Sequence, residues 1–517
     1  MKSEPLLLGV DVGTQGVKAS LVSLEGKVIC HSFEPYDTHY PKPGWVEHDM
    51  NQNWWKGSIA AIRNMLSQSP QKEPNILAIG ICGLYPALGP TDENGNPLYG
   101  AILYSDSRAY AEVEEINRRY NLRLSCEELT PKLVWFLRNE PDKAQKMKMF
   151  FDAPHYLIYK LSGAYVTDTI TAGLYGAIYE APTASWRKSV CASLEIPLDI
   201  LPQVYPPATV VGKVTKAASA LTNLPAGIPL VAGMPDLFGS MLSAGVTNTD
   251  EALVYYGSAG VVPVMKDSAI NAAFKPFPIA ERGGKVQEGY LYDYPAYCLS
   301  IGEAVRWFTD QFGEIEIYQQ RQEGGLSAFA RLDNLALQVS PSCEGLIFLP
   351  YLYGQRTPVD NPFASGVYFG LRAHHQKAHF YRAILEAWGY SIRYGLERTY
   401  PHGYSFRRFV ATGGGAKSQL WRQIVSDITG IPQDYVPNAE GTIGAAYIAG
   451  LAIGAFKDFK DLLSTWVSVK EATLPDESHH AAYERGYQAF RLLHQELQET
   501  FHKHHTLFHD IGEILHV

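Results

Sequence analysis

The feature that most constrains the fold is a strand, glycine-rich turn, strand pattern that occurs twice. The first copy occupies residues 6–33, and its first two apolar segments flank the loop Asp11-Val12-Gly13-Thr14-Gln15-Gly16. The second copy occupies residues 252–265 around Gly257-Ser258-Ala259-Gly260. Apolar runs bounded by glycine predict antiparallel hairpins. The recurrence is consistent with a duplicated architecture, although glycine hairpins also occur without duplication.

The length of the chain predicts two domains. At 517 residues it exceeds the size at which one hydrophobic core keeps growing. A buried strand at 229–232 leads to Asp236, a helix is expected at 237–245, and the polar segment Asn248-Thr249-Asp250 marks a boundary. We therefore predict an N-terminal α/β domain at residues 1–247 and a C-terminal one at 248–517.

Composition excludes several classes of protein. Hydrophobic residues make up 46% and charged residues 19%, which excludes a disordered chain. The net charge of −9 is spread along the chain, so we expect neither nucleic-acid nor membrane partners. The six cysteines form no Cys-x-x-Cys pair, which argues against zinc or disulfides and favours a cytoplasmic protein. The uncharged stretch 441–456 is too short and too rich in small residues to span a bilayer, so we predict a buried helix.

Asp11 follows the first strand and precedes a glycine. The glycine lets backbone N–H groups approach an anion while the carboxylate faces a cation, which suits a magnesium-phosphate group. An ordinary turn explains the same residues equally well.

Two glycine loops in the second half are further candidates for phosphate or nucleotide contacts. Gly257-Ser258 joins two strands, and a plain hairpin turn is the simpler explanation of it. Gly413-Gly414-Gly415 lies between a strand at 409–412 and a helix that begins near Leu420, where small residues and the helix terminus favour a nucleotide. Neither a Rossmann nor a P-loop glycine pattern is present there.

Asp236 is a candidate general base. It follows a buried strand directly, and a carboxylate there can accept the proton of a substrate hydroxyl that attacks phosphorus. The alternative is that it only caps the following helix, a position that aspartate favours.

The order of these motifs resembles the FGGY family of carbohydrate kinases, with the closest pattern among xylulokinases. The segments that carry the resemblance are GVDVGTQGVKASLV, PGWVEHDMNQNWW, AILYSDSR, AGMPDLFGSMLSAG, VYYGSAG, LPYLYGQRTPVDNPFASGVYFGL and ATGGGAKSQLWRQIVSDITG. The resemblance implies two actin-like, ribonuclease H-like α/β domains around a catalytic cleft, and ATP and Mg²⁺ as cofactors.

The resemblance also implies roles for individual residues. Asp11 would hold magnesium and Asp236 would be the general base. The phosphate and adenosine contacts would come from Gly13, Thr14, Gln15, Gly257, Ser258, Gly414, Gly415 and Ser418. The sugar would contact Tyr85, Pro86, Tyr104, Asp106, Asp236 and Leu237.

Departures from the family pattern cluster on the sugar side. Tyr85-Pro86 replaces Met-His of xylulokinases, Leu237 replaces an Asn or Gln, and Tyr104 replaces Trp, so these three changes leave the substrate open. Two milder changes are Gln355 for Glu and Ser258 for Thr.

The sequence therefore predicts transfer of the γ-phosphoryl group of ATP to a hydroxyl of a small sugar, with a ketopentose such as xylulose as the leading substrate. Another ketose, a polyol or glycerol remains an alternative, as does a sugar-sensing homologue without turnover. A homodimer is left open. The helical spacing of apolar residues predicts one or two terminal helices at residues 481–508. A metal site at the terminal His502, His504, His505 and His509 is disfavoured against a solvated last helix.

Overall fold

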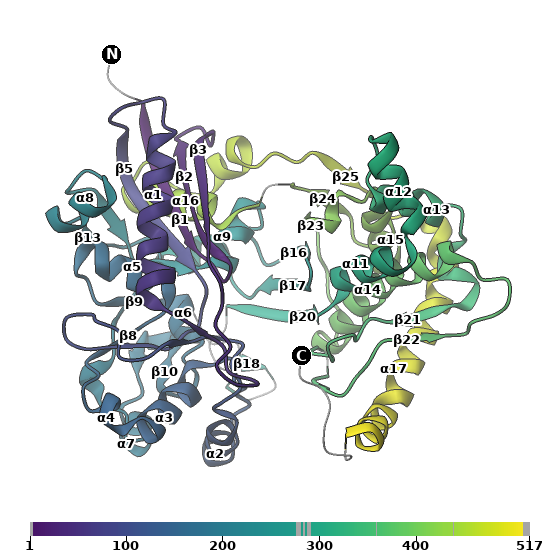
Figure 1. The fold of residues 1–517 in the computed structure, drawn as a ribbon, viewed down its shortest axis with the longest axis horizontal. Helices are drawn as coiled ribbons and strands as arrows, with labels where there is room; N and C mark the ends of the chain where they lie inside the picture. Colours follow the sequence, from purple (N-terminus) through teal and green to yellow (C-terminus); the bar gives the residue numbers. More distant parts are fainter. Residues whose placement is uncertain are drawn as a thin grey trace. The chain divides into compact units, whose positions relative to one another are not determined.

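The computed structural model describes residues 4–275, 281–282, 285–286, 291–357, 359–437 and 439–509, which form two compact units. The first unit comprises Met1–Asn248, Lys266–Leu291 and Ala439–Val467, and the second comprises Thr249–Met265, Tyr292–Asn438 and Ser468–Val517. The units change near Asn248, but a single cut there does not separate them, because two later segments of the chain join the first unit (Figure 1).

The first unit contains a seven-stranded sheet in the order β13-β14-β5-β1-β2-β3, with β15 also paired to β5. Its first three strands form the predicted antiparallel meander, and β5 and β14 continue the sheet in parallel with β1. The strands are β1 (Pro5–Val12), β2 (Gly16–Ser23), β3 (Val28–Pro35), β5 (Asn75–Gly83), β13 (Val210–Lys213), β14 (Pro229–Val231) and β15 (Met234–Pro235).

The second unit repeats this topology. Its sheet has the order β20-β17-β16-β23-β24-β25, in which β16, β17 and β20 are an antiparallel meander and β23 and β24 run parallel to β16. The strands are β16 (Glu251–Tyr256), β17 (Gly260–Met265), β20 (Tyr292–Cys298), β23 (Arg408–Thr412), β24 (Gln433–Tyr435) and β25 (Glu471–Thr473). The shared order of three antiparallel and two parallel strands confirms the predicted pair of actin-like domains.

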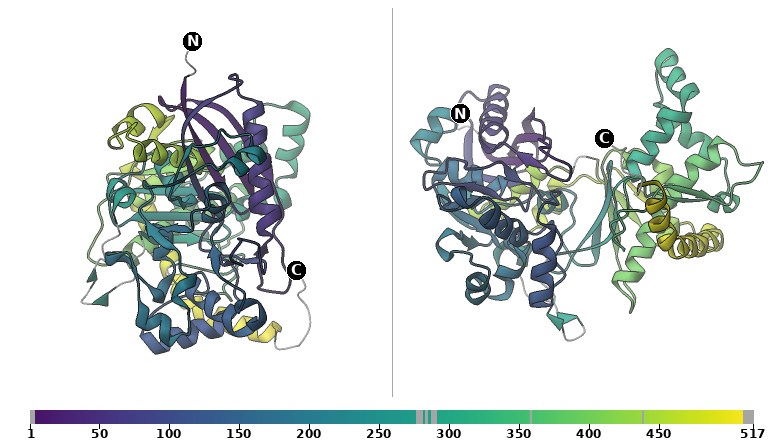
Figure 2. Two further views of the ribbon diagram at one scale, coloured as in Figure 1. Left: turned by 90° about the vertical axis from the view of Figure 1, so that its left-hand side faces the viewer. Right: turned by 60° about the horizontal axis from the view of Figure 1, so that its bottom comes forward.

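Strand alternation divides the first sheet into two faces. On β1, Leu6, Leu8 and Val10 join the core formed with helices α1 (Gly57–Ser67) and α5 (Ala153–Ser162). The intervening residues, which include Gly9 and Asp11, lie against α16 (Gly441–Ala452). Figure 2 shows the purple meander between the purple α1 on one side and the yellow-green α16 on the other.

Helix α16 packs on this sheet through backbone contacts that only glycine permits. A Cβ at Gly9 would lie 1.8 Å from the carbonyl oxygen of Thr442, and a Cβ at Gly80 would lie 1.9 Å from that of Ala445. Helix α9 (Asp236–Ser243) approaches equally closely, because a Cβ at Gly444 would lie 2.2 Å from the carbonyl oxygen of Gly239. The buried helix predicted within 441–456 is confirmed for Gly441–Ala452, where it ends.

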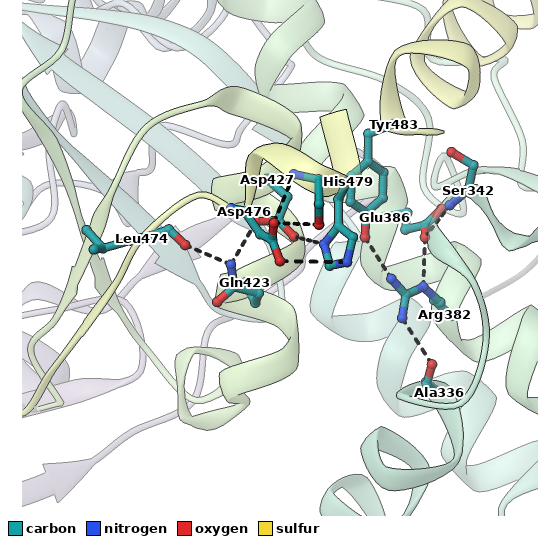
Figure 3. A network of polar contacts seen from close by, with 11 residues as sticks. Ala336, Ser342, Arg382, Glu386, Gln423, Asp427, Leu474, Asp476, His479 and Tyr483 are labelled. Carbon is teal, nitrogen blue, oxygen red and sulfur yellow. Dashed lines mark hydrogen bonds and ion pairs between the residues drawn. The ribbon is translucent and has the colours of Figure 1, made fainter. Parts of the chain in front are cut away.

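The helices of the second unit are joined by buried polar groups (Figure 3). On α14 (Lys377–Thr399), Arg382 pairs with Glu386 at 2.9 Å and donates to the hydroxyl of Tyr483 on α17 (His480–His509) at 2.7 Å. Asp427 on α15 (Gln419–Thr429) contacts His479 at 2.8 Å. These bonds fix α17, the helix predicted at residues 481–508, to the core of the unit.

The remaining helices and strands complete the two units. The first unit also contains α2 (Tyr110–Tyr120), α3 (Leu129–Asn139), α4 (Pro141–Ala144), α6 (Thr169–Gly173), α7 (Lys188–Ser193), α8 (Lys216–Thr222), α10 (Ala269–Phe274), β4 (Glu47–His48), β6 (Gly89–Thr91), β7 (Ala101–Ile102), β8 (Met149–Phe151), β9 (Val166–Asp168), β10 (Tyr179–Glu180), β11 (Ser185–Trp186), β12 (Gln203–Tyr205), β18 (Glu281–Arg282) and β19 (Lys285–Val286). The second unit also contains α11 (Ile301–Phe312), α12 (Glu314–Glu323), α13 (Ala328–Ala336), β21 (Ile347–Leu349) and β22 (Val367–Phe369). None of the helices in the described residues is both long and apolar enough to cross a membrane.

Gly80→Ala is expected to destabilise the first unit. The new methyl group would meet the backbone of α16, which cannot move aside as a flexible side chain can. We expect a loss of about 2 kcal/mol or more in the free energy of unfolding, measured by urea denaturation. Gly414→Ala is the matched control, because a Cβ there meets nothing within 4 Å. Equal stability of the two variants would contradict the close packing of α16.

Candidate active site

Three neighbouring parallel strands of the first sheet bring two carboxylates together. Asp11 on β1 is paired with Cys82 on β5, and Cys82 is paired with Met234 on β15. Asp236 follows β15 at once as the first residue of α9. In open α/β sheets ligands bind at the carboxyl ends of the strands, which is where Asp11 and Asp236 lie.

Asp11 has an incompletely satisfied carboxylate. Its Oδ1 is buried and has no hydrogen-bond partner among the described residues. Burial raises the pKa of Asp11 to about 6, an effect that Glu440 reinforces and that Lys18 and the Cys82 thiol oppose. A buried acceptor without a partner is a group that a bound cation would satisfy.

The pKa of Asp236 is raised further than that of Asp11. Burial, followed by the negative charge of Asp11, raises the pKa of Asp236 to about 7, while the N–H of Leu237 and the charge of Lys18 oppose the shift. The cap of α9 is Pro235, and Asp236 instead accepts the N–H of Leu237 at 2.6 Å. The capping explanation of Asp236 therefore does not describe this helix.

Three residues that the motifs did not single out complete this centre. Lys18 is paired with Asp11 across β1 and β2, and its Nζ lies 3.9 Å from Glu440 Oε1. Cys82 lies between the carboxylates, whose charges raise the pKa of its buried thiol further. Strand alternation could have identified Lys18, since it lies opposite Asp11, but Glu440 comes from a segment too distant in sequence for any local pattern to place it.

The predicted sugar-side residues have different surroundings. Pro86 is buried, and Tyr85 and Leu237 are half-buried. Tyr104 is also half-buried and bonds to the side chain of Thr14.

Asp106, another predicted sugar contact, is completely buried. Its carboxylate accepts bonds from the Arg108 guanidinium at 2.9 and 2.7 Å and from the N–H groups of Arg108 and Val46. Arg108 in turn pairs with Glu47 at 2.8 Å and lies over the ring of Trp45. Four accepted bonds leave the Asp106 carboxylate without free acceptor capacity.

The predicted nucleotide loops of the second unit leave adjacent parallel strands. Strands β16 and β23 pair side by side, and the Gly257-Ser258 turn and the loop at Gly413-Gly414-Gly415 follow their carboxyl ends. Gly413 has φ 94°, and a Cβ there would lie 2.8 Å from the carbonyl oxygen of Tyr256. Ser258 and Gly414 are exposed, so their backbone is accessible to a ligand.

Ser418 has a structural role in this loop. Its hydroxyl accepts the N–H of Trp421 at 3.0 Å and so caps α15. It also bonds to Asp333. The helix N-terminus that it caps is directed toward the glycine loop, as the sequence predicts for a nucleotide site.

One other group of the described residues has metal-ligand spacing, namely Glu344, His374 and His375. The backbone N–H of Arg372 donates to Nδ1 of His375 at 3.1 Å, which leaves the proton of the neutral ring on Nε2. The Glu344 carboxylate already pairs with His374 at 2.9 Å, so this group is described as imidazoles around a carboxylate. His502, His504 and His505 belong to α17, with His502 and His504 exposed, and the side chain of His509 lies outside the described residues.

The fold and this strand-end centre define a two-domain sugar kinase, and comparisons with known proteins agree. Residues 6–243 match the N-terminal domain of the FGGY family of carbohydrate kinases, and residues 253–453 match its C-terminal domain. Xylulose kinase of Escherichia coli is 27% identical over 95% of this chain and 99% of its own. L-xylulose/3-keto-L-gulonate kinase of the same organism is 28% identical over 97% and 99%.

A solved structure gives the same result. The crystal structure of xylulose kinase from Rhodospirillum rubrum has a TM-score of 0.82 at 28% identity and covers 96% of this chain and all of its own. The chain belongs to the FGGY family of carbohydrate kinases. It is an enzyme that phosphorylates a sugar with ATP, as its motifs predict.

The pKa values predict a pH-dependent stability of the first unit. A carboxyl group whose pKa rises on folding from 3.8 to about 7 favours the folded state at low pH, and this contribution is lost as the pH rises through about 7. Asp236→Asn should therefore be more stable than the unchanged protein at pH 8.5, and the difference should vanish near pH 4. Urea midpoints in EDTA at pH 4, 6 and 8.5 measure this, with the exposed Asp360→Asn as control. A difference that is constant with pH would contradict the raised pKa.

Proposed function

We propose that the enzyme transfers the γ-phosphoryl group of ATP to a small ketose of the size of a ketopentose such as xylulose. The observation that carries this is the pair of Asp11 and Asp236 at the ends of β1 and β15, in a chain that matches xylulose kinases along nearly its whole length. We assign Asp106 and Arg108 a structural role beside the sugar site, because their charges already pair with each other.

Asp236 is the proposed general base. A base works best when its pKa lies close to the working pH, because it is then both largely ionised and able to hold a proton. Burial and the neighbouring Asp11 bring the pKa of Asp236 to about 7. The carboxylate accepts the proton of the sugar hydroxyl as that oxygen bonds to phosphorus, and ADP leaves with the electrons of the broken bond.

Asp11 is the proposed magnesium residue. Its unpartnered buried Oδ1 and its raised pKa fit a cation that would compensate the charge. Mg²⁺ suits a single carboxylate supplemented by water and phosphate oxygens, and it supplies neutralisation of phosphate charge when bound. We assign the phosphate contacts to Gly13, Thr14, Gln15, Gly257 and Ser258, and the adenosine contacts to Gly414, Gly415 and Ser418.

The residues beside Asp236 bear on the choice of sugar. Pro86 and Leu237 have no side-chain hydrogen-bonding groups, in contrast to the family's usual residues. A sugar hydroxyl placed against them would lose its water partners without replacement. Within the class of small ketoses we therefore expect a substrate with a methyl, a methylene or fewer hydroxyls toward Pro86 and Leu237.

A sugar-sensing homologue without turnover is the alternative from another class, and the presence of both carboxylates argues against it. A cytoplasmic location and a homodimer belong to the proposal as well. The exposed apolar side chains Phe312, Ile315 and Tyr318 near α12 offer a surface for such a dimer, and light scattering of the purified protein would give its mass.

Asp236→Asn should abolish phosphoryl transfer and leave ATP binding nearly intact. The amide keeps the shape of the carboxylate but cannot accept the hydroxyl proton. Turnover is measured with a coupled ADP assay and binding by calorimetry. Asp11→Asn is the companion variant, in which the magnesium dependence of binding should change instead. Near-normal turnover by Asp236→Asn would contradict the role of this residue.

The substrate preference is tested with a panel of xylulose, ribulose, a deoxy-ketose and simple polyols. We expect a higher kcat/KM for the deoxy-ketose than for xylulose. Leu237→Asn should raise the kcat/KM for xylulose relative to that for the deoxy-ketose. The expected gain corresponds to about 1 to 2 kcal/mol, the scale of one neutral hydrogen bond. If the unchanged enzyme prefers xylulose to every other member of the panel, then Tyr85 or another polar group supplies the contacts.

A further inference from the structure

The loop after Asp11 is held from one side by side chains that are distant in sequence. The hydroxyl of Tyr36 donates to the carbonyl oxygen of Gly13 at 2.5 Å. His48 bonds to the backbone of Thr14, and Tyr104 bonds to the Thr14 side chain. Two consecutive peptide groups of the loop are therefore fixed through their oxygens.

Trp54 decides which nitrogen of His48 carries the proton. An indole N–H can only donate, and Nε1 of Trp54 lies 3.1 Å from Nδ1 of His48. Nδ1 must therefore be the acceptor, which places the ring proton on Nε2. From Nε2 the ring donates to the Thr38 hydroxyl at 3.0 Å, and the same N–H is bonded to the backbone of Thr14.

His48 also stays neutral, so this arrangement persists at physiological pH. Its ring and that of Trp54 are both buried. Burial lowers the pKa of His48 to about 4, and the bond to Thr14 opposes this shift only in part. A neutral ring has a single N–H, and the contact with Trp54 places it on Nε2, the nitrogen that is bonded to the Thr38 hydroxyl and to the Thr14 backbone.

The direction of the loop N–H groups follows from the planarity of the peptide. In a trans peptide the C=O of one residue and the N–H of the next point in opposite directions. The bond from Tyr36 to Gly13 thus directs the N–H of Thr14 away from Tyr36, and the bond from His48 to Thr14 directs the N–H of Gln15 away from His48. Within the described part of the chain neither N–H donates to another group, so two adjacent donors remain for an anion.

We propose that Trp54 and His48 are positioning residues, which hold the Thr14 peptide so that the N–H groups of Thr14 and Gln15 are directed at the phosphates of ATP. This inference rests on the proposed function of the loop. Donors that are already oriented need no rearrangement when charge develops on the phosphates, so they stabilise that charge at little cost. Without the bond from His48, the Thr14 carbonyl loses its buried partner and the peptide is free to rotate.

A matched pair of variants tests the donor. His48→Gln keeps an N–H that can reach Thr14, and His48→Leu has a similar size without any donor. We expect His48→Leu to raise the Kd and KM for magnesium-ATP about tenfold, as for the loss of one buried hydrogen bond, with the KM for sugar unchanged. His48→Gln should restore most of this affinity. Urea midpoints show whether each variant is folded.

A second experiment tests the proton position and does not depend on catalysis. Two-bond ¹H–¹⁵N correlation spectra distinguish the two neutral forms of a histidine ring, and His48 should have its proton on Nε2. Trp54→Phe keeps an aromatic ring but removes the donor, so a mixture of the two forms and weaker magnesium-ATP binding are expected. Trp55→Phe is the control, because Trp55 is half-buried and its ring contacts Lys160 instead.

The outcomes separate this inference from the proposed function. A proton on Nδ1 of His48 in the unchanged protein overturns the inference, and so does unchanged magnesium-ATP affinity in His48→Leu in an active enzyme. If His48→Leu does not fold, the inference is tested by comparing the His48 proton position and the magnesium-ATP affinity of Trp54→Phe with those of Trp55→Phe. Absence of turnover with every sugar would refute the proposed function alone, since the spectra and the binding of magnesium-ATP would still report on the loop.

Discussion

The contact between the backbone of α16 and the glycines of β1, β5 and α9 is the interaction on which the first unit depends. Gly9, Gly80 and Gly239 remove the side chains that would hold the helix away from the sheet. Because α16 approaches so closely, its first residue Gly441 packs against the carboxylate of Asp11, where a Cβ would lie 3.2 Å from Oδ2. The same packing that buries the helix therefore also closes one side of the candidate active site.

Burial at this point sets the chemistry of both carboxylates. Asp11 and Asp236 lie at the ends of β1 and β15, on either side of β5. The charge of Asp11 raises the tendency of Asp236 to hold a proton, Glu440 does the same for Asp11, and Lys18 limits both effects. Isolated in water, either group would be ionised at neutral pH and would be a weak base. The enclosed strand ends give Asp236 a pKa of about 7 and leave Asp11 with an oxygen that has no hydrogen-bond partner in the described part of the chain. Both conditions favour a phosphoryl-transfer site, and both destabilise the empty protein as the pH rises.

Local sequence patterns predicted the elements well because their residues are near neighbours in the chain. The meander at residues 6–33, the hairpin at 252–265 and the helices at 237–245 and 481–508 all occur as expected. The predicted boundary after residue 247 does not separate the two units completely, because the later segment Ala439–Val467 belongs to the first unit. No local pattern reveals that association, because its partners Gly9 and Gly80 lie more than half the chain away. Asp106 is a different case, because its partner Arg108 is only two residues away, and the structure shows that the two side chains pair.

The sequence by itself determined the family and the two-domain architecture and made Asp11 and Asp236 the candidate site residues, because ordered motifs and strand-ending carboxylates are local properties of the chain. Only the tertiary structure decided which groups surround them. The proton of His48 lies on Nε2 because Trp54 contacts its other nitrogen, and the pKa of Asp236 rises because α9 and β1 bring it close to Asp11 away from water. Hydrogen-bond direction and desolvation depend on the distances between side chains in three dimensions, so they arise only when the chain has folded.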